Sequence, residues 1–230
     1  MVKRLLIIPA RSGSTRIPNK NMKVFFGKPI IEYGLNVAIK SKLFETIHIS
    51  TNNHDNINYF KKYKLLDNFI RPEKLSKDHI PIIKVMAFVL KKFKEKGKFF
   101  DEIWMLLPCS PLIQVQDLFN GSKILKKDKA FTTVALNQVP IQWNYEIKMN
   151  KLKPIFNLFL KKRSQNIKQT VFEVGVFAGW KTNYFLNKLK KNKDFVFSPL
   201  ILDYFKSFDI DTLEDWNIVK KVYKHSLHKK

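Results

Sequence analysis

The sequence is poor in cysteine and in long apolar runs. Cys109 is the one cysteine among 230 residues, so no disulfide can form within the chain, which fits a reducing compartment. Its apolar surroundings favour a buried, inert thiol over a nucleophile. The apolar run after Arg4 has only about five residues, too few for a signal peptide, and no stretch approaches the roughly 20 residues of a membrane span. We therefore expect a soluble cytoplasmic protein with no membrane partner.

Acidic residues are also scarce, with 19 Asp and Glu against 43 Lys and Arg, which gives a net charge of +24. Such an excess is typical of proteins that bind nucleic acid or anionic membranes. Here the lysines lie in scattered runs, such as 91–98 and 188–193, without interleaved aromatic residues, as expected of a solvated surface. We therefore expect attraction of small anionic substrates and no specific nucleic-acid partner. Arginine, whose planar fork suits phosphates, occurs only five times, and four of these lie in the polar segments described below.

Apolar residues make up 45% of the chain, enough for one sizeable core, and we expect a single domain over residues 1–230. Continuous apolar runs alternate with helical patterns. This alternation predicts an α/β fold, a three-layer αβα Rossmann-like sheet whose parallel strands are covered on both faces. The expected strands are 4–9, 46–50, 68–70, 103–107, 130–136 and 206–210. The expected helices are 29–40, 55–64, 81–96, 115–127 and 213–224.

The periodic pattern is lost between residues 140 and 195. Large apolar side chains are frequent there but follow neither a helical nor a strand period. Exposed aromatic residues often mark an interaction surface. We therefore expect 140–195 to be an insertion that packs against a second protein chain.

A polar loop, ARSGSTRIPNKN at residues 10–21, follows the first expected strand. The carboxyl edge of a parallel sheet is where open α/β folds bind ligands. Gly13 allows a tight backbone path, and Arg11, Arg16 and Lys20 supply positive charge for a polyphosphate. The loop matches neither G-x-x-x-x-G-K-[ST] nor G-x-G-x-x-G. The alternative is a basic loop that is merely solvated.

Two carboxylates lie near the end of the chain, in the segment FDIDT at 208–212. In a strand, Asp209 and Asp211 would share one face, where two hard oxygen ligands suit Mg²⁺ bound together with substrate phosphates. The alternative is that Asp211 belongs to a helix cap formed with Thr212 and Asp215.

Six segments together resemble a known family. They are IIPARSGSTRIPNKN, GKPIIEYGLNVAIKS, STNN, RPEKLSKDH, LLPCSPL and DIDTLEDW. Their order and spacing resemble those of the acylneuraminate cytidylyltransferases, which make CMP-activated sialic acids and related nonulosonic acids. The resemblance covers nearly the whole chain, and the segment KKRSQNIKQTVFEVGVFAGW at 161–180 is most similar to the branch that activates pseudaminic acid.

The resemblance implies a nucleotidyltransferase that transfers CMP from CTP to the anomeric hydroxyl of a nonulosonic acid and releases pyrophosphate. It implies that Arg11 and Lys20 hold the CTP phosphates, in a substrate-binding loop that includes Ser12 and Gly13. No residue is clearly a general base, although His79 lies nearest the implied site.

The remaining implied roles concern the base, the metal and the sugar. Asn21 and Arg71 match positions near the cytidine, and Asp209 and Asp211 match a pair that binds Mg²⁺. By the same resemblance, Arg163 and Gln165 would contact the sugar acid, in this subunit or in a neighbouring one. The family forms dimers through an inserted segment, so a homodimer is implied.

The chain also departs from the family. Sialic-acid enzymes have Gln-Pro-Thr-Ser-Pro where this chain has LPCSP at 107–111, and Asn52 replaces an aspartate. Thr15-Arg16 replaces a more usual Lys-Gly or Lys-Arg pair. The first difference argues against sialic acid as the substrate. The other two are interpreted as divergence within an active enzyme, the alternative being a changed substrate or a lost activity. The alternatives are an enzyme for legionaminic or sialic acid, one for 3-deoxy-manno-octulosonate, against which the RSQ segment at 163–165 argues, or a basic nucleic-acid-binding protein, against which the aspartate pair argues.

Overall fold

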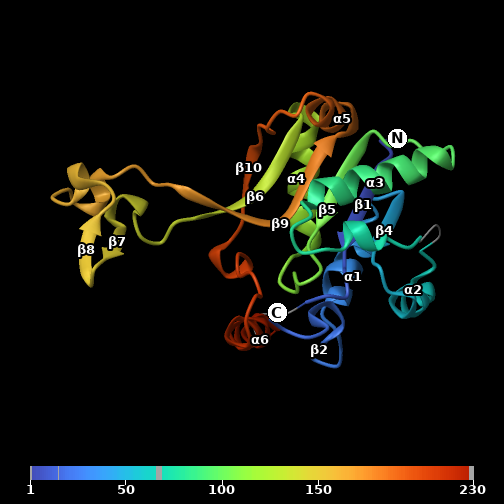
Figure 1. Ribbon diagram of the computed structural model, residues 1–230, viewed down its shortest axis with the longest axis horizontal. Helices are drawn as coiled ribbons and strands as arrows, with labels where there is room; N and C mark the ends of the chain where they lie inside the picture. Colours follow the sequence, from blue (N-terminus) through green and yellow to red (C-terminus); the bar gives the residue numbers. More distant parts are fainter. Residues whose placement is uncertain (1, 15, 66–68, 228–230) are drawn as a thin grey trace.

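The structure, a computed structural model, describes residues 2–14, 16–65 and 69–227. Its centre is a six-stranded sheet with the order β10-β6-β9-β5-β1-β4 (Figure 1). The strands are β1 (Arg4–Pro9), β4 (Thr46–Ser50), β5 (Glu102–Leu106), β6 (Ala130–Leu136), β9 (Val171–Lys181) and β10 (Ser198–Ile201). All the pairings are parallel except those of β9, which is antiparallel to both β5 and β6.

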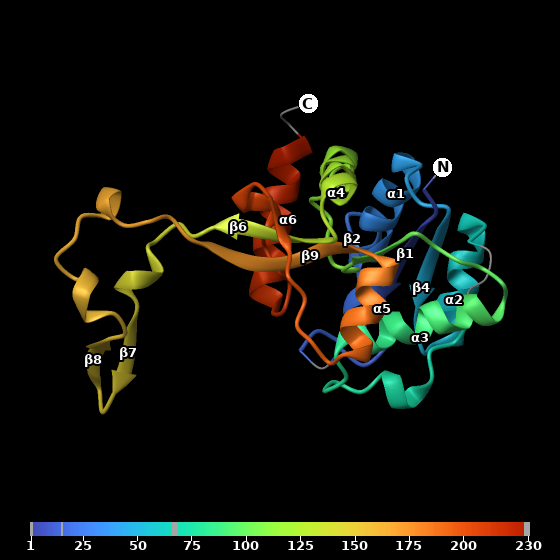
Figure 2. The same ribbon diagram turned by 90° about the horizontal axis from the view of Figure 1, so that it is seen from above.

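Helices cover both faces of this sheet. They are α1 (Ile31–Ser41), α2 (His54–Phe60), α3 (Ile82–Glu95), α4 (Val115–Lys127), α5 (Thr182–Lys190) and α6 (Leu213–Leu227). Alternate residues of β1 enter different cores because successive strand side chains point to opposite faces. Leu6 and Ile8 pack with α1 and α4, whereas Leu5 and Ile7 pack with α3 and α5. Figure 2 shows α1 and α4 on one side of the sheet and α3 and α5 on the other. The three-layer αβα prediction is therefore confirmed.

A third, smaller core forms beside the sheet. It joins α6 to the short antiparallel pair β2 (Val24–Phe25) and β3 (Lys28–Pro29), with Phe25, Cys109, Ile210 and Trp216 buried together. This core holds the loop that precedes α6. No helix in the described part of the chain is long and apolar enough to cross a membrane.

Some expected elements were wrong. Residues 206–210 form no strand, because β10 takes the position beside β6 and the chain then passes through a 3-10 helix, Tyr204–Lys206, into a loop. Ile210 is nevertheless fully buried while Asp209 is exposed, so the apolar alternation reflects packing without strand pairing. Phe69 and Ile70 are not in a strand, and Asn68 lies outside the described residues. The strands β9 and β10 and the helix α5 were missed.

Residues 137–170 form an arm that projects from the body (Figures 1 and 2). It carries a hairpin of β7 (Tyr145–Lys148) and β8 (Lys151–Pro154). The arm leaves β6 at Leu136 and returns to β9 at Val171, and these two residues are register partners. Residues 171–190 of the irregular region belong to the main layers as β9 and α5.

Candidate active site

A cavity of about 300 Å³ opens at the carboxyl ends of β1 and β5. Four segments line it: the loop after β1, the loop that leads into α3, the loop after β5 and the loop before α6. Seven residues expected in the site lie in its wall: Arg11, Arg16, Lys20, Asn21, Arg71, Asp209 and Asp211. The fold thus brings together side chains from opposite ends of the chain.

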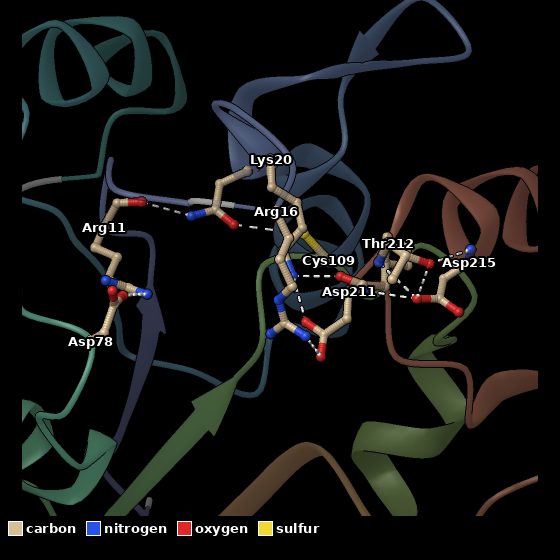
Figure 3. Close-up of polar contacts among 10 residues, drawn as sticks. Arg11, Arg16, Lys20, Asp78, Cys109, Asp211, Thr212 and Asp215 are labelled. Carbon is tan, nitrogen blue, oxygen red and sulfur yellow. Dashed lines mark hydrogen bonds and ion pairs between the residues drawn. The ribbon is translucent and has the colours of Figure 1, made fainter.

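Three of the cavity's cations, among them Arg11 and Lys20, are paired with carboxylates (Figure 3). Arg11 forms an ion pair with Asp78 and donates a hydrogen bond from Nη1 to the Ser76 carbonyl at 3.3 Å. Lys20 Nζ donates to the Ile210 carbonyl and lies 3.3 Å from Asp211 Oδ1. Both cations are therefore held in place by groups of the cavity wall.

Arg71 is buried, with only 4% of its surface exposed, and it is held by hydrogen bonds to a serine and not by an ion pair with any residue that the structure describes. Its Nε donates to Ser50 Oγ at 3.1 Å, and Nη2 donates to the Ser50 carbonyl. Burial, and then the nearby charge of Arg11, lower the pKa of Arg71 to about 10. This value is still far above neutral, so the guanidinium stays charged and has no carboxylate partner among the described residues.

The cap of α6 and the carboxylate of Asp211 are separate features. Asp215 Oδ2 accepts the backbone N–H groups of Asp211 at 3.0 Å and Thr212 at 2.7 Å, and Thr212 Oγ1 accepts from the Asp215 N–H at 3.2 Å. Hydrogen bonds from Thr212 lower the pKa of Asp215. The side chain of Asp211 takes no part in this cap, and it pairs with Arg16 at 2.8 Å and with Lys20 (Figure 3). The cap therefore leaves Asp211 available to a ligand.

Asn52 anchors the loop that carries Arg11. Its Oδ1 accepts from the backbone N–H of Ser12 at 3.0 Å and from Ser12 Oγ at 3.1 Å, and its Nδ2 donates to Glu73 at 3.2 Å. An ionised carboxylate could not make the last bond, because it has no donor. Ser12 and Gly13 lie in this loop but not in the cavity wall. Gly13 has no positive φ, and an added Cβ would meet only Arg11 Nη1 at 3.8 Å, so nothing steric requires glycine.

The sequence did not identify every residue of the cavity wall. Cys109 lies there and is 8% exposed, which confirms that the thiol is buried, and this burial raises its pKa to about 12. Asp78 and Lys77 also line the cavity, and their segment, RPEKLSKDH at 71–79, resembled the family without indicating a role for either residue. Arg163 and Gln165 lie on the arm, exposed and outside the cavity wall.

The fold and the cavity define an α/β protein that can bind a polyphosphate at the carboxyl edge of its sheet. Comparison with known proteins adds the family. Residues 5–155 match the family model described as Cytidylyltransferase. The chain belongs to this family, and it is a CTP-using nucleotidyltransferase.

Two relatives match along nearly the whole length. The pseudaminic acid cytidylyltransferase of Campylobacter jejuni subsp. jejuni serotype O:2 is 29% identical and covers 97% of both chains. The CMP-N,N'-diacetyllegionaminic acid synthase of Legionella pneumophila subsp. pneumophila is 28% identical and covers 95% of both. Among solved structures, CMP:2-keto-3-deoxy-manno-octonic acid synthetase in complex with CTP has a TM-score of 0.71, with 13% identity, and covers 97% of this chain and 99% of that one. This last likeness shows the fold alone.

Proposed function

We propose that the protein transfers CMP from CTP to the anomeric hydroxyl of a nonulosonic acid, pseudaminic acid, and releases pyrophosphate. The observation that carries the proposal is the cavity whose wall contains the cations Arg11 and Lys20 together with the carboxylates Asp209 and Asp211. Cations of this kind suit a triphosphate, and the paired carboxylates suit a metal bound to it. The relatives named for pseudaminic and legionaminic acid support a nine-carbon acid as the acceptor.

The donor set fits Mg²⁺. The described residues include no group of three or more His, Cys, Asp or Glu that could hold a metal. Asp209 and Asp211 are two hard oxygen donors that lie in the cavity wall. Mg²⁺ commonly binds one or two protein carboxylates and keeps water or phosphate oxygens as its other ligands. When bound there, Mg²⁺ would neutralise phosphate charge and lower the pKa of a coordinated hydroxyl.

The chain's own residues then position the reactants. The sugar hydroxyl forms a new bond to the α-phosphorus of CTP, and the bond to pyrophosphate breaks. Arg11 and Lys20 exchange Asp78 and Asp211 for phosphate oxygens and so stabilise the charge that moves onto pyrophosphate. Arg71, which is fixed against Ser50 and stays charged, would lie near the cytidine without rearrangement. Such positioning accounts for most of the catalysis expected here.

The arm supplies the proposed dimer. Its exposed apolar side chains include Ile147, Leu152 and Leu158, which are 73%, 68% and 86% exposed. Burial of such a surface drives association. Arg163 and Gln165 lie in this arm, exposed and outside the cavity wall, so we propose that they reach the sugar acid in the cavity of a second copy. The single buried thiol suits the cytoplasm, where we expect the enzyme to act.

The first test measures pyrophosphate release from CTP and Mg²⁺ with pseudaminic, legionaminic, sialic and octulosonic acids. We expect release with pseudaminic acid. Asp209→Asn and Asp211→Asn should abolish it, whereas Asp128→Asn, an exposed carboxylate between α4 and β6, should leave it unchanged. Release with another acid would correct the substrate. If no pyrophosphate is released with any of the four acids, and the protein binds nucleic acid at moderate salt, the proposed cytidylyltransferase function is refuted.

A further inference from the structure

A chain of hydrogen bonds crosses the cavity wall from Cys109 through Asn21 to the backbone of Arg11. Cys109 Sγ lies 3.6 Å from Asn21 Oδ1, and Asn21 Nδ2 lies 3.0 Å from the Arg11 carbonyl oxygen. Asn21 is 7% exposed and Cys109 is 8% exposed, so water competes little for these groups. Cys109 also packs in the core formed with Ile210 and Trp216, which fixes the sulfur's position.

The contacts determine how the Asn21 amide is oriented. The Arg11 carbonyl oxygen can only accept, so the group of Asn21 that faces it must be the NH₂. The amide oxygen then faces Cys109, and the thiol must be the donor. Burial raises the pKa of the thiol to about 12, so it keeps this proton at neutral pH. A flipped amide would place two acceptor oxygens against each other at Arg11 and lose the bond from the thiol.

The locked amide keeps two further hydrogen-bonding capacities. Asn21 can donate two hydrogen bonds and accept two, and its described partners use one of each. The remaining N–H and lone pair belong to a residue of the cavity wall. A fixed C=O beside a fixed N–H matches the amino group and ring N3 of cytosine. Uracil presents the opposite pattern, an acceptor at position 4 and a donor at N3, which requires the flipped amide.

We propose that Cys109 is a positioning residue that locks the Asn21 amide and thereby favours CTP over UTP. The inference rests on the proposed function, because it takes the cavity as the nucleotide site. Losing one hydrogen bond of ordinary net strength changes an equilibrium by about threefold to tenfold. The Arg11 carbonyl also orients the Asn21 amide, so loss of the Cys109 contact should reduce the preference for cytosine without abolishing it.

The test measures the dissociation constants of CTP and UTP by isothermal titration calorimetry, with melting temperatures as the record of folding. Cys109→Ala should reduce the CTP-over-UTP ratio by about threefold to tenfold. Cys109→Ser keeps a donor and should restore the ratio of the unchanged protein. Cys109→Val, which lacks the donor but fills the space, should behave like Cys109→Ala and replaces it if the alanine variant does not fold.

A second arm of the experiment isolates the contact. In an Asn21→Ala background, Cys109→Ala should leave the nucleotide ratio unchanged, because the amide it orients is gone. An unchanged ratio in Cys109→Ala alone, equal losses in the serine and alanine variants, or a further loss in the Asn21→Ala background would refute the inference while leaving the proposed function intact. A protein that binds neither CTP nor UTP would refute both.

Discussion

Replacing Glu102 by glutamine removes a negative charge from the middle of the sheet. The Glu102 side chain is 1% exposed and accepts from Arg4 Nε and Lys181 Nζ, each at 2.8 Å, and from Trp104 Nε1 at 3.3 Å. Arg4 and Lys181 are its register partners on β1 and β9. One carboxylate therefore ties together three adjacent strands, including the strand that leads into the site loop.

The expected cost follows from this geometry. Breaking a buried ion pair costs about 3–5 kcal/mol, because a charge is left without a partner. Lys181 is 37% exposed at its side chain and can turn toward water, whereas Arg4 is 12% exposed and cannot do so as freely. Glutamine keeps one acceptor oxygen but presents an NH₂ to one of the cations. We therefore expect Glu102→Gln to lower the free energy of unfolding by about 3 kcal/mol.

Urea unfolding at neutral pH measures this loss. With a slope of about 3 kcal/mol per molar, the midpoint should fall by about 1 M with no change in slope. The matched control is Glu95→Gln, which removes a carboxylate paired with Lys92 on the surface of α3, where both side chains are nearly half exposed. We expect no measurable shift there, because surface ion pairs contribute little. A Glu102→Gln midpoint no lower than that of the control would refute the reasoning.

Three further predictions concern single residues. Arg71→Met should weaken CTP binding at least tenfold in calorimetry and change the free energy of unfolding little. The reason for the second result is that burial of the charged guanidinium, which lowers the pKa of Arg71 to about 10, is itself unfavourable. A clear loss of stability with normal CTP affinity would contradict this. Burial alone would raise the pKa of Glu32, but hydrogen bonds from Lys62 and Tyr59 lower it overall from 4.5. The ionised Glu32 therefore stabilises the folded protein above pH 4.5, and this contribution is lost as the pH falls through the lower pKa of the folded state. Glu32→Gln should therefore reduce the drop in urea midpoint between about pH 7 and about pH 3, and an equal drop in both proteins would exclude this role. Thr212→Ala removes the hydroxyl that accepts from the Asp215 N–H at the start of α6, and it should lower the free energy of unfolding in urea by about 1 kcal/mol, most of which Thr212→Ser should retain.

Local sequence patterns were sufficient to predict the strands that are buried on both faces of the sheet. The strands β1, β4 and β6 are buried along nearly their whole length, and their bounds match the prediction. β9 was missed because its outer half is exposed and pairs at the base of the arm, which gives it no single period. The segment at 206–210 shows strand-like alternation because Ile210 packs under α6, a tertiary contact that sequence spacing cannot distinguish from a sheet.

The candidate site was predicted where polar residues follow an apolar strand or match a family motif. Arg11, Lys20, Asn21 and the two aspartates meet in the cavity as expected. The pairing of Arg11 with Asp78 joins residues far apart in the chain, and it depends on how the loop before α3 folds back over β1. No local pattern encodes such a contact, and this also applies to the bond between Cys109 and Asn21.

The arm begins and ends at neighbouring positions of the sheet. Leu136 and Val171 face each other in register, so the polypeptide between them is, for the body of the protein, a long hairpin connection. A change in its length leaves the strand order untouched, and loop closure makes extra residues inexpensive. The dimer contact and the acceptor contact proposed for the arm could therefore change without altering the strand order around the nucleotide cavity.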